Sequence, residues 1–448
     1  MGLIKIKKGL DLPLAGQPQQ QVHAGGQVKH VALLGPDYVG MKPTMAVQTG
    51  DHVQCGDVLF TDKKNQRVAY TAPGAGKIVA VNRGDKRAFL SVVIELSAQE
   101  EDKVFPSFQL SDLELLSKEQ ITTSLLETGL WPSIKMRPFG KVANPDDVPN
   151  SLFVNVMDTN PLAPDMAVVV NESIKEFSAG LQVLSILVAK VYVCTANRNF
   201  IPALKADNIV VQEFSGPHPA GNSGTHIHLL DPVDRHKIVW TIGAQEVIAI
   251  GSFFLSGKIS HEKIVALAGP GVKNPRLIRA RIGASVSELL SSEEIAAHQR
   301  IISGSVLNGH TAADALDFIG RFDQQITVIP EGDKRPFLGW MGPGLDLYST
   351  CNVVLGKFFR NNLKFTTALN GGKRSIVPIG TFEKVMPLDL EPTFLLKALA
   401  VDDVEEAELL GCLELIEEDL ALCTYVCPAK IDHGLELRRN LDIIEKEG

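Results

Sequence analysis

Between positions 28 and 97, short runs of apolar residues alternate with turn signals. The signals are glycines beside proline, aspartate or alanine, as at Gly35-Pro36, Gly50-Asp51, Gly56-Asp57 and the stretch 72–76. Strands this short, at this spacing, predict a small β-barrel or sandwich.

From position 113 onward the chain alternates between helical and strand-like segments. Apolar residues recur at helical spacing over 113–126 and 167–180, whereas apolar runs over 152–157, 184–195 and 209–214 predict strands. The run 184–195 is rich in Val and Ile, as expected for a buried parallel strand. This alternation predicts a Rossmann-like α/β layer. No G-x-G-x-x-G follows any of these strands, so the usual dinucleotide fingerprint is absent.

The last part of the chain carries two further patterns. Strand signals at 263–268 and 277–282, followed by a short helix at 286–290, predict a β-grasp (ubiquitin-like) unit. Residues 387–401 and 402–422 have helix-forming composition, which predicts a mostly helical C-terminal part.

We therefore expect a multi-domain protein of mixed α/β and α+β class. The predicted domains are a β-barrel at 1–100, an α/β domain at 101–255, a β-grasp domain at 256–330 and a mostly helical domain at 331–448.

Composition narrows the possible partners. The 448 residues suggest roughly three domains. The net charge is −8 and no Lys/Arg run dominates any stretch, so nucleic acid is not an expected partner. The first residues lack the apolar core of a signal peptide. The most apolar long segment, 238–255, contains Gln245 and Glu246, so we expect no transmembrane helix.

Three segments resemble one protein family. They are KIKKGLDLPLAG at 5–16, HVALLGPDYVGMKPTMAVQTGDHVQCGDVLF at 30–60 and ALAGPGVKNPRLIRARIGASVSELL at 266–290. Together they resemble the A subunit of the sodium-pumping NADH:quinone reductase of bacterial respiratory chains, over essentially the whole chain. The related families are the C subunit of the Rnf complex and the flavin-carrying NADH subunit of complex I.

The stretch 50–77 also resembles the flattened barrel of biotinyl and lipoyl carrier domains. In those domains a lysine at a hairpin tip carries the prosthetic group. Lys63 and Lys64 lie near that place, but the residues around them do not match the carrier motif. We expect a carrier-like barrel without a prosthetic group.

Both cofactor sites of the related families are degenerate in this chain. Their flavin loop has the form G-x-G-G-x-G-F-P-T, whereas residues 128–141 read TGLWPSIKMRPFGK and contain two prolines, which cannot donate a backbone N–H. The cluster motif of Rnf C subunits has the form C-x2-C-x2-C-x3-C-P. This chain keeps Cys423, Cys427 and the following proline, with Leu420 and Glu417 at the other two ligand positions. A cubane cluster needs four thiolates. We expect no cofactor bound by this chain, with NADH and the flavins in other subunits.

The resemblance implies that the chain handles ubiquinone, and the loop 129–140 suggests where. Apolar side chains and one or two hydrogen-bond donors suit a quinone headgroup. The apolar candidates are Trp131, Ile134, Met136 and Phe139, the donors are Lys135 and Arg137, and Tyr38 and Met41 are weaker candidates for the same cleft. The alternative is that the loop packs on the barrel while its charges face water.

Histidines raise a second possibility. His226 and His228 would lie on one face of a strand and could grip a metal ion from two points. No third ligand stands at a defined spacing. The favoured interpretation is therefore that these histidines line a solvated loop near an interface and bind no metal ion.

The resemblance implies a peripheral subunit on the cytoplasmic face of the bacterial inner membrane. Its expected partners are the other subunits, especially an integral-membrane one. The complex would be an oxidoreductase and translocase that couples ubiquinone reduction to sodium export, and the isolated chain would be inactive. Two alternatives stay open: a cofactor-free structural cap without quinone contact, and an Rnf-like electron carrier with flavin or iron–sulfur absorbance.

Overall fold

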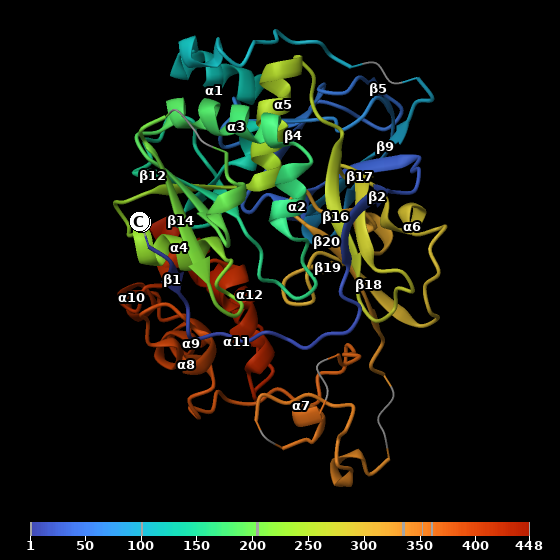
Figure 1. Cartoon of the computed structure of the whole chain (residues 1–448), viewed down its shortest axis with the longest axis vertical. Coiled ribbons are helices and arrows are strands. Elements are labelled where there is room, and N and C mark those ends of the chain that lie inside the picture. The colour runs from blue at the N-terminus through green and yellow to red at the C-terminus, as the bar shows by residue number, and fades with distance from the viewer. Residues whose placement is uncertain are drawn as a thin grey trace.

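The computed structural model describes residues 2–99, 102–202, 206–333, 337–351, 353–359 and 362–447. Within these residues, the strands form four sheets, and helices dominate the C-terminal part (Figure 1). The barrel, the α/β layer, the β-grasp sheet and the C-terminal helices confirm the predicted fold class.

The first domain is a barrel of two antiparallel sheets that share one core. Their strand orders are β3-β9-β8-β5 and β4-β6-β7. The strands are β3 (His30–Leu34), β4 (Pro43–Met45), β5 (His52–Val53), β6 (Val58–Asp62), β7 (Ala69–Thr71), β8 (Gly76–Arg83) and β9 (Phe89–Leu96). Phe60 stacks on Tyr70 with ring centroids 4.7 Å apart, and Tyr38 meets Tyr70 edge-on at 4.6 Å. These aromatic rings fill the interior of the barrel.

The second domain is a seven-stranded sheet in the order β1-β14-β13-β12-β15-β10-β11. The first five strands of this order are parallel, and β10 and β11 are antiparallel to their neighbours. The strands are β1 (Ile4–Lys5), β10 (Lys135–Arg137), β11 (Lys141–Val142), β12 (Ser151–Val156), β13 (Val191–Thr195), β14 (Ile209–Ser215) and β15 (Val239–Gly243).

Helices cover this sheet. They are α1 (Lys118–Glu127), α2 (Met166–Asn171), α3 (Ile174–Leu187), α4 (Ser223–Leu230) and α5 (Ala244–Ser256). Helix α1 starts at a capping box, in which the Ser117 hydroxyl accepts from the Gln120 backbone N–H while the Gln120 side chain accepts from the Ser117 backbone N–H. Helices α3 and α5 approach at Gly180 and Gly251, whose missing side chains allow backbone contact.

One predicted strand boundary was wrong. The apolar run 184–195 is not all strand, because α3 continues to Leu187 and β13 begins at Val191. A fully buried helix and a fully buried strand both read as continuous apolar runs, so periodicity could not place the border between them.

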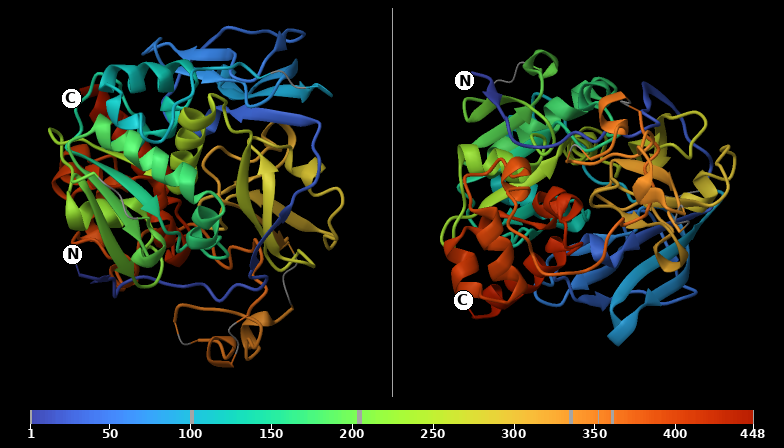
Figure 2. Two further views of the ribbon diagram at one scale, coloured as in Figure 1. Left: turned by 45° about the horizontal axis from the view of Figure 1, so that its top comes forward. Right: turned by 90° about the horizontal axis from the view of Figure 1, so that it is seen from below.

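The third domain is a six-stranded sheet in the order β19-β18-β20-β16-β17-β2. Its elements are β16 (Glu262–Ala268), β17 (Arg276–Arg281), α6 (Val286–Leu289), β18 (Gln299–Ser303), β19 (His310–Thr311) and β20 (Gln325–Pro330). The edge strand β2 (Gln19–Ala24) comes from the N-terminus and pairs in parallel with β17. Figure 2 shows the N-terminal segment crossing from the α/β sheet, where β1 pairs with β14, to this sheet. Both strands therefore pair outside the barrel, although they lie within residues 1–100.

The C-terminal part is mostly helical, as predicted. Its helices are α7 (Gly356–Phe359), α8 (Phe382–Val385), α9 (Pro392–Ala400), α10 (Val404–Leu409), α11 (Ala421–Val426) and α12 (His433–Glu447). The segment 402–422, which has helix-forming composition, contains α10, the 3₁₀ turns Cys412–Glu414 and Glu417–Leu420, and the start of α11. Cys423 and Cys427 are buried in the apolar core of these helices, and burial raises the pKa of Cys423 to about 12.

The segment around α7 extends away from the rest of the molecule (Figure 1). Many of its large apolar side chains are exposed, among them Phe337 at 93% and Val353 at 75%. Among the described residues, no helix combines the length and apolar character that a bilayer crossing requires.

Candidate functional site

A cleft of about 180 Å³ lies where the strand order of the α/β sheet reverses. Strands β13 and β14 follow on one side of β12, whereas β15 lies on the other side. In open α/β sheets, ligands bind at the carboxyl ends of the strands at such a switch point. At this edge, Asn155 lies next to the last residue of β12, Met157 and Asp158 directly follow the strand, and Ile242 and Gly243 end β15; all five line the cleft.

Three other parts of the chain close the cleft. Strand β10 contributes Lys135 and Arg137, the β-grasp domain contributes Phe322 and Asp323, and the C-terminal helices contribute Glu418. Helix α5 begins at Ala244 on the wall of the cleft, so its unpaired backbone N–H groups lie at that wall. The site thus forms only when three domains are folded together.

Lys135 brings a cation to this cleft. Its Nζ lies 3.5 Å from the centroid of the Phe322 ring, a cation–π contact. Burial lowers the pKa of Lys135, while nearby carboxylates, Glu418 first among them, act in the opposite direction. Lys135 and Phe322 therefore place a cationic hydrogen-bond donor next to a flat aromatic surface.

Three carboxyl groups in or beside the cleft, those of Glu418, Asp158 and Asp37, have raised pKa values. Burial, followed by the charge of Asp419, raises the pKa of Glu418 to about 7. Burial also raises the pKa of Asp158. Just behind the cleft wall, burial and then Asp323 raise the pKa of Asp37 to about 6. The Glu418 carboxyl group therefore keeps its proton to a higher pH than an exposed glutamate does.

Arg137 also lines the cleft, but its charge is already engaged. Its guanidinium donates to a carboxylate oxygen of Asp419 at 2.9 Å and to the Glu414 carbonyl oxygen at 2.7 Å. The side chains of Arg137 and Asp419 are each only 2% exposed. This ion pair joins the α/β sheet to the C-terminal helices, so its first role is structural.

The predicted quinone loop is divided between the core, the cleft and a second cavity. Trp131 and Ile134 are buried in the core, and the Trp131 indole N–H donates to the Ala143 carbonyl oxygen at 2.8 Å. Because side chains alternate along β10, Met136 lies on the other side from Lys135 and Arg137. Met136 and Met41 line a separate cavity of about 280 Å³ beside the barrel.

The other two candidates lie outside the cleft. Tyr38 is buried in the barrel core. Phe139 has a left-handed backbone (φ 77°) and packs against the C-terminal helices. The structure thus brings Lys135 and Arg137 together at the cleft and separates them from the other six predicted residues.

The prediction that His226 and His228 lie on a strand was wrong, because both belong to helix α4. Residues two apart on a helix point in roughly opposite directions. The buried His226 ring donates through Nε2 to the Ala220 carbonyl oxygen at 2.9 Å, and burial lowers its pKa to about 4. His228 Nδ1 bonds Glu414 at 2.8 Å and its Nε2 accepts from the Asp389 backbone N–H. The two imidazole rings therefore cannot bind the same metal ion.

Sequence reasoning missed most of the cleft. Asn155 and Asp158 stand at the end of the predicted strand 152–157, so a search for a switch point could have found them. Gly243 ends β15, which was not among the predicted strands. Phe322 and Glu418 come from other domains, and no local pattern indicates that they converge here.

Comparisons with known proteins cover nearly the whole chain. Residues 4–97 match the NqrA N-terminal barrel-sandwich hybrid domain, residues 116–259 the NqrA second alpha/beta domain, and residues 264–314 the NQRA C-terminal domain. Two curated relatives are named as the A subunit of the Na(+)-translocating NADH-quinone reductase, and each match covers 100% of both chains. The relative from Histophilus somni is 51% identical over 447 residues, and the one from Neisseria gonorrhoeae is 50% identical over 448 residues. A solved NAD+-reducing [NiFe]-hydrogenase chain is 11% identical over 52% of both chains with a TM-score of 0.35, which is too weak a likeness to carry an argument.

Proposed function

The chain belongs to the family formed by the A subunit of the Na(+)-translocating NADH-quinone reductase, and we propose that it binds the ubiquinone headgroup within that complex. The proposed site is the cleft at the ends of β12 and β15. The observation that carries the proposal is the placement of Lys135 over Phe322 at a topological switch point.

The cleft has the chemistry that a quinone requires. Met157, Met166, Ile242 and Phe322 give it apolar walls for a substituted ring. The volume of about 180 Å³ is below the roughly 300–1,000 Å³ of clefts for drug-sized ligands, so it suits a single ring. Lys135 can donate to a quinone carbonyl oxygen and stabilise the negative charge that grows on it during reduction.

Reduction of a quinone to a quinol takes up two electrons and two protons. Glu418 lines the cleft, and burial raises its pKa, so its carboxyl group is suited to hold a proton beside the quinone ring. Asp158 is a second acid on the same wall, with a pKa also raised by burial. We propose that these groups supply protons, while the electrons come from the other subunits of the complex.

Lys135→Met is the direct test of this site. The change keeps an apolar chain over Phe322 but removes the charged donor, whose hydrogen bond is worth about 1.5–3 kcal/mol. We expect the Kd of a short-chain ubiquinone for the purified chain to rise by about 10- to 100-fold in calorimetry. The KM for ubiquinone of the assembled complex should rise similarly.

Lys190→Met is the matched control. Lys190 also lies over an aromatic ring, with Nζ 4.5 Å from the Tyr192 centroid, but it does not line the cleft. Quinone binding and turnover should stay unchanged in this variant. If Lys135→Met and Lys190→Met both leave the KM of the complex for ubiquinone unchanged, this quinone site is rejected. That result would favour the alternative of a structural cap without quinone contact.

We also propose that the exposed apolar side chains in the described parts of 337–379 dock on an integral-membrane subunit, which would hold the chain at the cytoplasmic face of the membrane. Large contiguous apolar patches on a folded protein mark interaction sites. Phe337, Met341, Val353, Phe358 and Leu369 are between 59% and 93% exposed in this segment. Exposing these apolar side chains to water does not stabilise the isolated chain, whereas a partner subunit would remove them from water.

The test is co-purification of the other subunits with a variant of the chain. Serine at Phe337, Met341 and Val353 should reduce their recovery about tenfold or more, since each buried apolar side chain contributes about 1.5–3 kcal/mol. The control variant carries serine at Val104, Leu115 and Val148, which are 72–83% exposed elsewhere on the surface. Equal recovery with the two variants would contradict the docking proposal.

A further inference from the structure

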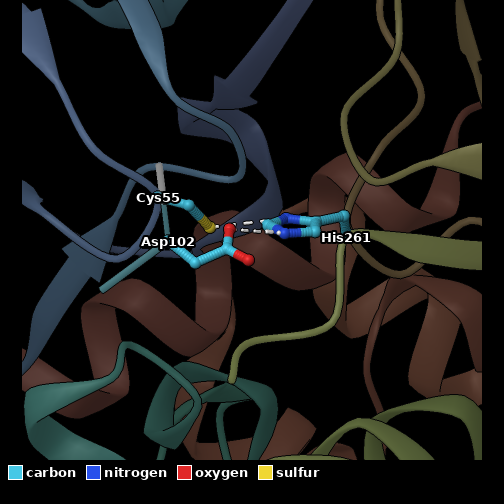
Figure 3. A group of neighbouring side chains, drawn as sticks. All are labelled: Cys55, Asp102 and His261. Atoms are coloured by element: carbon cyan, nitrogen blue, oxygen red, sulfur yellow. Dashed lines mark hydrogen bonds and ion pairs between the residues drawn. The ribbon is translucent and has the colours of Figure 1, made fainter. Parts of the chain in front are cut away.

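Cys55, Asp102 and His261 meet at the junction of three segments (Figure 3). Cys55 lies between β5 and β6 of the barrel, Asp102 in the connector after β9, and His261 directly before β16. Backbone contacts hold them there. Cys55 and Asp102 form an isolated parallel bridge, and the His261 carbonyl oxygen accepts from the Ile282 backbone N–H at 2.8 Å.

Their side chains are already close together. Cys55 Sγ is 3.4 Å from His261 Nδ1, and His261 Nε2 is 2.9 Å from Asp102 Oδ1. One potential ligand atom from each residue lies within 4.8 Å of the other two. Cys55 is buried, whereas the side chains of Asp102 and His261 are each more than a fifth exposed. The cluster is therefore shielded on the thiol side and open to solvent on the other.

We propose that this cluster binds a divalent transition-metal ion, with Zn²⁺ as the best-suited ion. Thiolate, imidazole and carboxylate are the three ligand types that protein zinc sites use. With Zn–S near 2.3 Å and Zn–N near 2.0–2.1 Å, a tetrahedral ion sets its sulfur and nitrogen ligands roughly 3.5 Å apart. The Cys55–His261 separation of 3.4 Å nearly matches that value.

The ion would sit against Cys55 Sγ and His261 Nδ1. Asp102, which accepts from Nε2 in this structure, turns its carboxylate toward the ion as the third ligand, and water takes the fourth position on the open side. The other Asp102 oxygen lies 3.6 Å from Lys258 Nζ, an exposed side chain that can move aside. Binding releases the thiol proton, so a thiolate and a carboxylate balance the two charges of the ion. Affinity should therefore fall as the pH is lowered.

Metal binding here would fasten the barrel to the β-grasp domain. A site whose ligands come from separate segments exists only in the folded chain, so the binding free energy adds to the stability of the folded state. This role is independent of quinone binding, because none of the three residues lines the proposed quinone cleft.

Cobalt titration of the full chain tests the proposal. After removal of metal with a chelator, Co²⁺ should bind at one ion per chain and give the thiolate-to-cobalt charge-transfer band and strong visible bands of a tetrahedral sulfur-ligated ion. Zn²⁺ should displace it. Cys55→Ser and His261→Gln should abolish the band and weaken Zn²⁺ binding by more than the roughly 10- to 100-fold that loss of an outer-shell partner costs.

Two controls match these variants. Cys351→Ser removes an exposed thiol, and His298→Gln removes a histidine that also bonds a carboxylate, Asp333 at 3.1 Å. Both should keep the cobalt band. Thermal melts test whether the variants are folded. Without metal, the Cys55 and His261 variants should unfold cooperatively. On adding Zn²⁺, the Tm should rise only for chains in which the cluster is intact.

Absence of the band in the wild-type chain would overturn the proposal and leave a hydrogen-bonded thiol–imidazole–carboxylate group. A band that persists in Cys55→Ser would overturn it as well, since the ion would then lie elsewhere.

Discussion

Arg137→Ala is expected to lower the free energy of unfolding by about 3–5 kcal/mol, the range for breaking one side of a buried ion pair. The change leaves the Asp419 carboxylate 2% exposed with no countercharge beside it. Among the residues that the structure describes, Asp419 Oδ2 would then keep the Ile416 backbone N–H at 3.0 Å as its one hydrogen-bond donor. Within the described residues, Asp419 Oδ1 has no hydrogen-bond partner even before the change. The loss should be visible as a lower urea midpoint.

Arg235→Ala is the matched control for this prediction. Arg235 also joins the α/β domain to the C-terminal helices, through Glu408, but these two side chains are 44% and 27% exposed. Solvent screens such a pair, so its loss should cost about 1 kcal/mol or less.

The double variant Arg137→Met with Asp419→Leu should recover at least half of the loss, because it removes both buried charges together. If Arg137→Ala costs no more than Arg235→Ala, the buried pair does not hold the C-terminal helices to the sheet.

Gly251→Ala is also expected to destabilise the fold. A Cβ at this position would lie 1.8 Å from the Glu176 carbonyl oxygen and 2.6 Å from the Gly180 backbone nitrogen. Both atoms belong to the backbone of α3, so the two helices must separate. Alanine gains about 1 kcal/mol of helix propensity, but overpacking of a close helix contact costs about 1–3 kcal/mol or more.

At contacts this short, the steric cost should exceed the propensity gain, so we expect Tm to fall by several degrees. Ser252→Ala, the next residue along α5, is the control and should leave Tm nearly unchanged. An increase in Tm for Gly251→Ala would mean that α3 and α5 do not pack as closely as described.

Local patterns were enough to predict the domain types but not the contacts between domains. Turn signals around Gly50 and Gly56 correctly indicated a barrel, and the run 277–282 a β-grasp strand. The end of α3 near Leu187 and the strand β13 are both buried, so both are continuously apolar and the hydrophobic pattern does not mark the border between them. The HIH segment at 226–228 reads equally well as strand or helix, and tertiary packing decided for helix.

The candidate site shows the same limit. Lys135 was predicted because hydrogen-bond donors beside apolar residues suit a quinone, yet its neighbour Met136 faces another cavity. Residues 135–137 form a strand, in which successive side chains point to opposite sides. From the sequence this segment was interpreted as a loop, so the two side chains could not be separated. Phe322 and Glu418 reach the cleft from distant parts of the chain. Cys55 and His261 are likewise 206 residues apart in sequence, so only the folded arrangement indicates a shared role.

The pairing of the N-terminal strands has a consequence for the order in which the nascent chain can fold. Ile4 pairs with Phe214 and Ala24 with Arg279, so both strands leave the ribosome long before their partners exist. At roughly 5–20 residues per second, β2 waits on the order of 10–50 s for β17. The sequence of β2, QQQVHA, offers little apolar surface to chaperones or to aggregation during this interval. Residues 4–24 therefore reach their native pairings only after β14 and β17 have been made, later than the barrel strands that directly follow them in the chain.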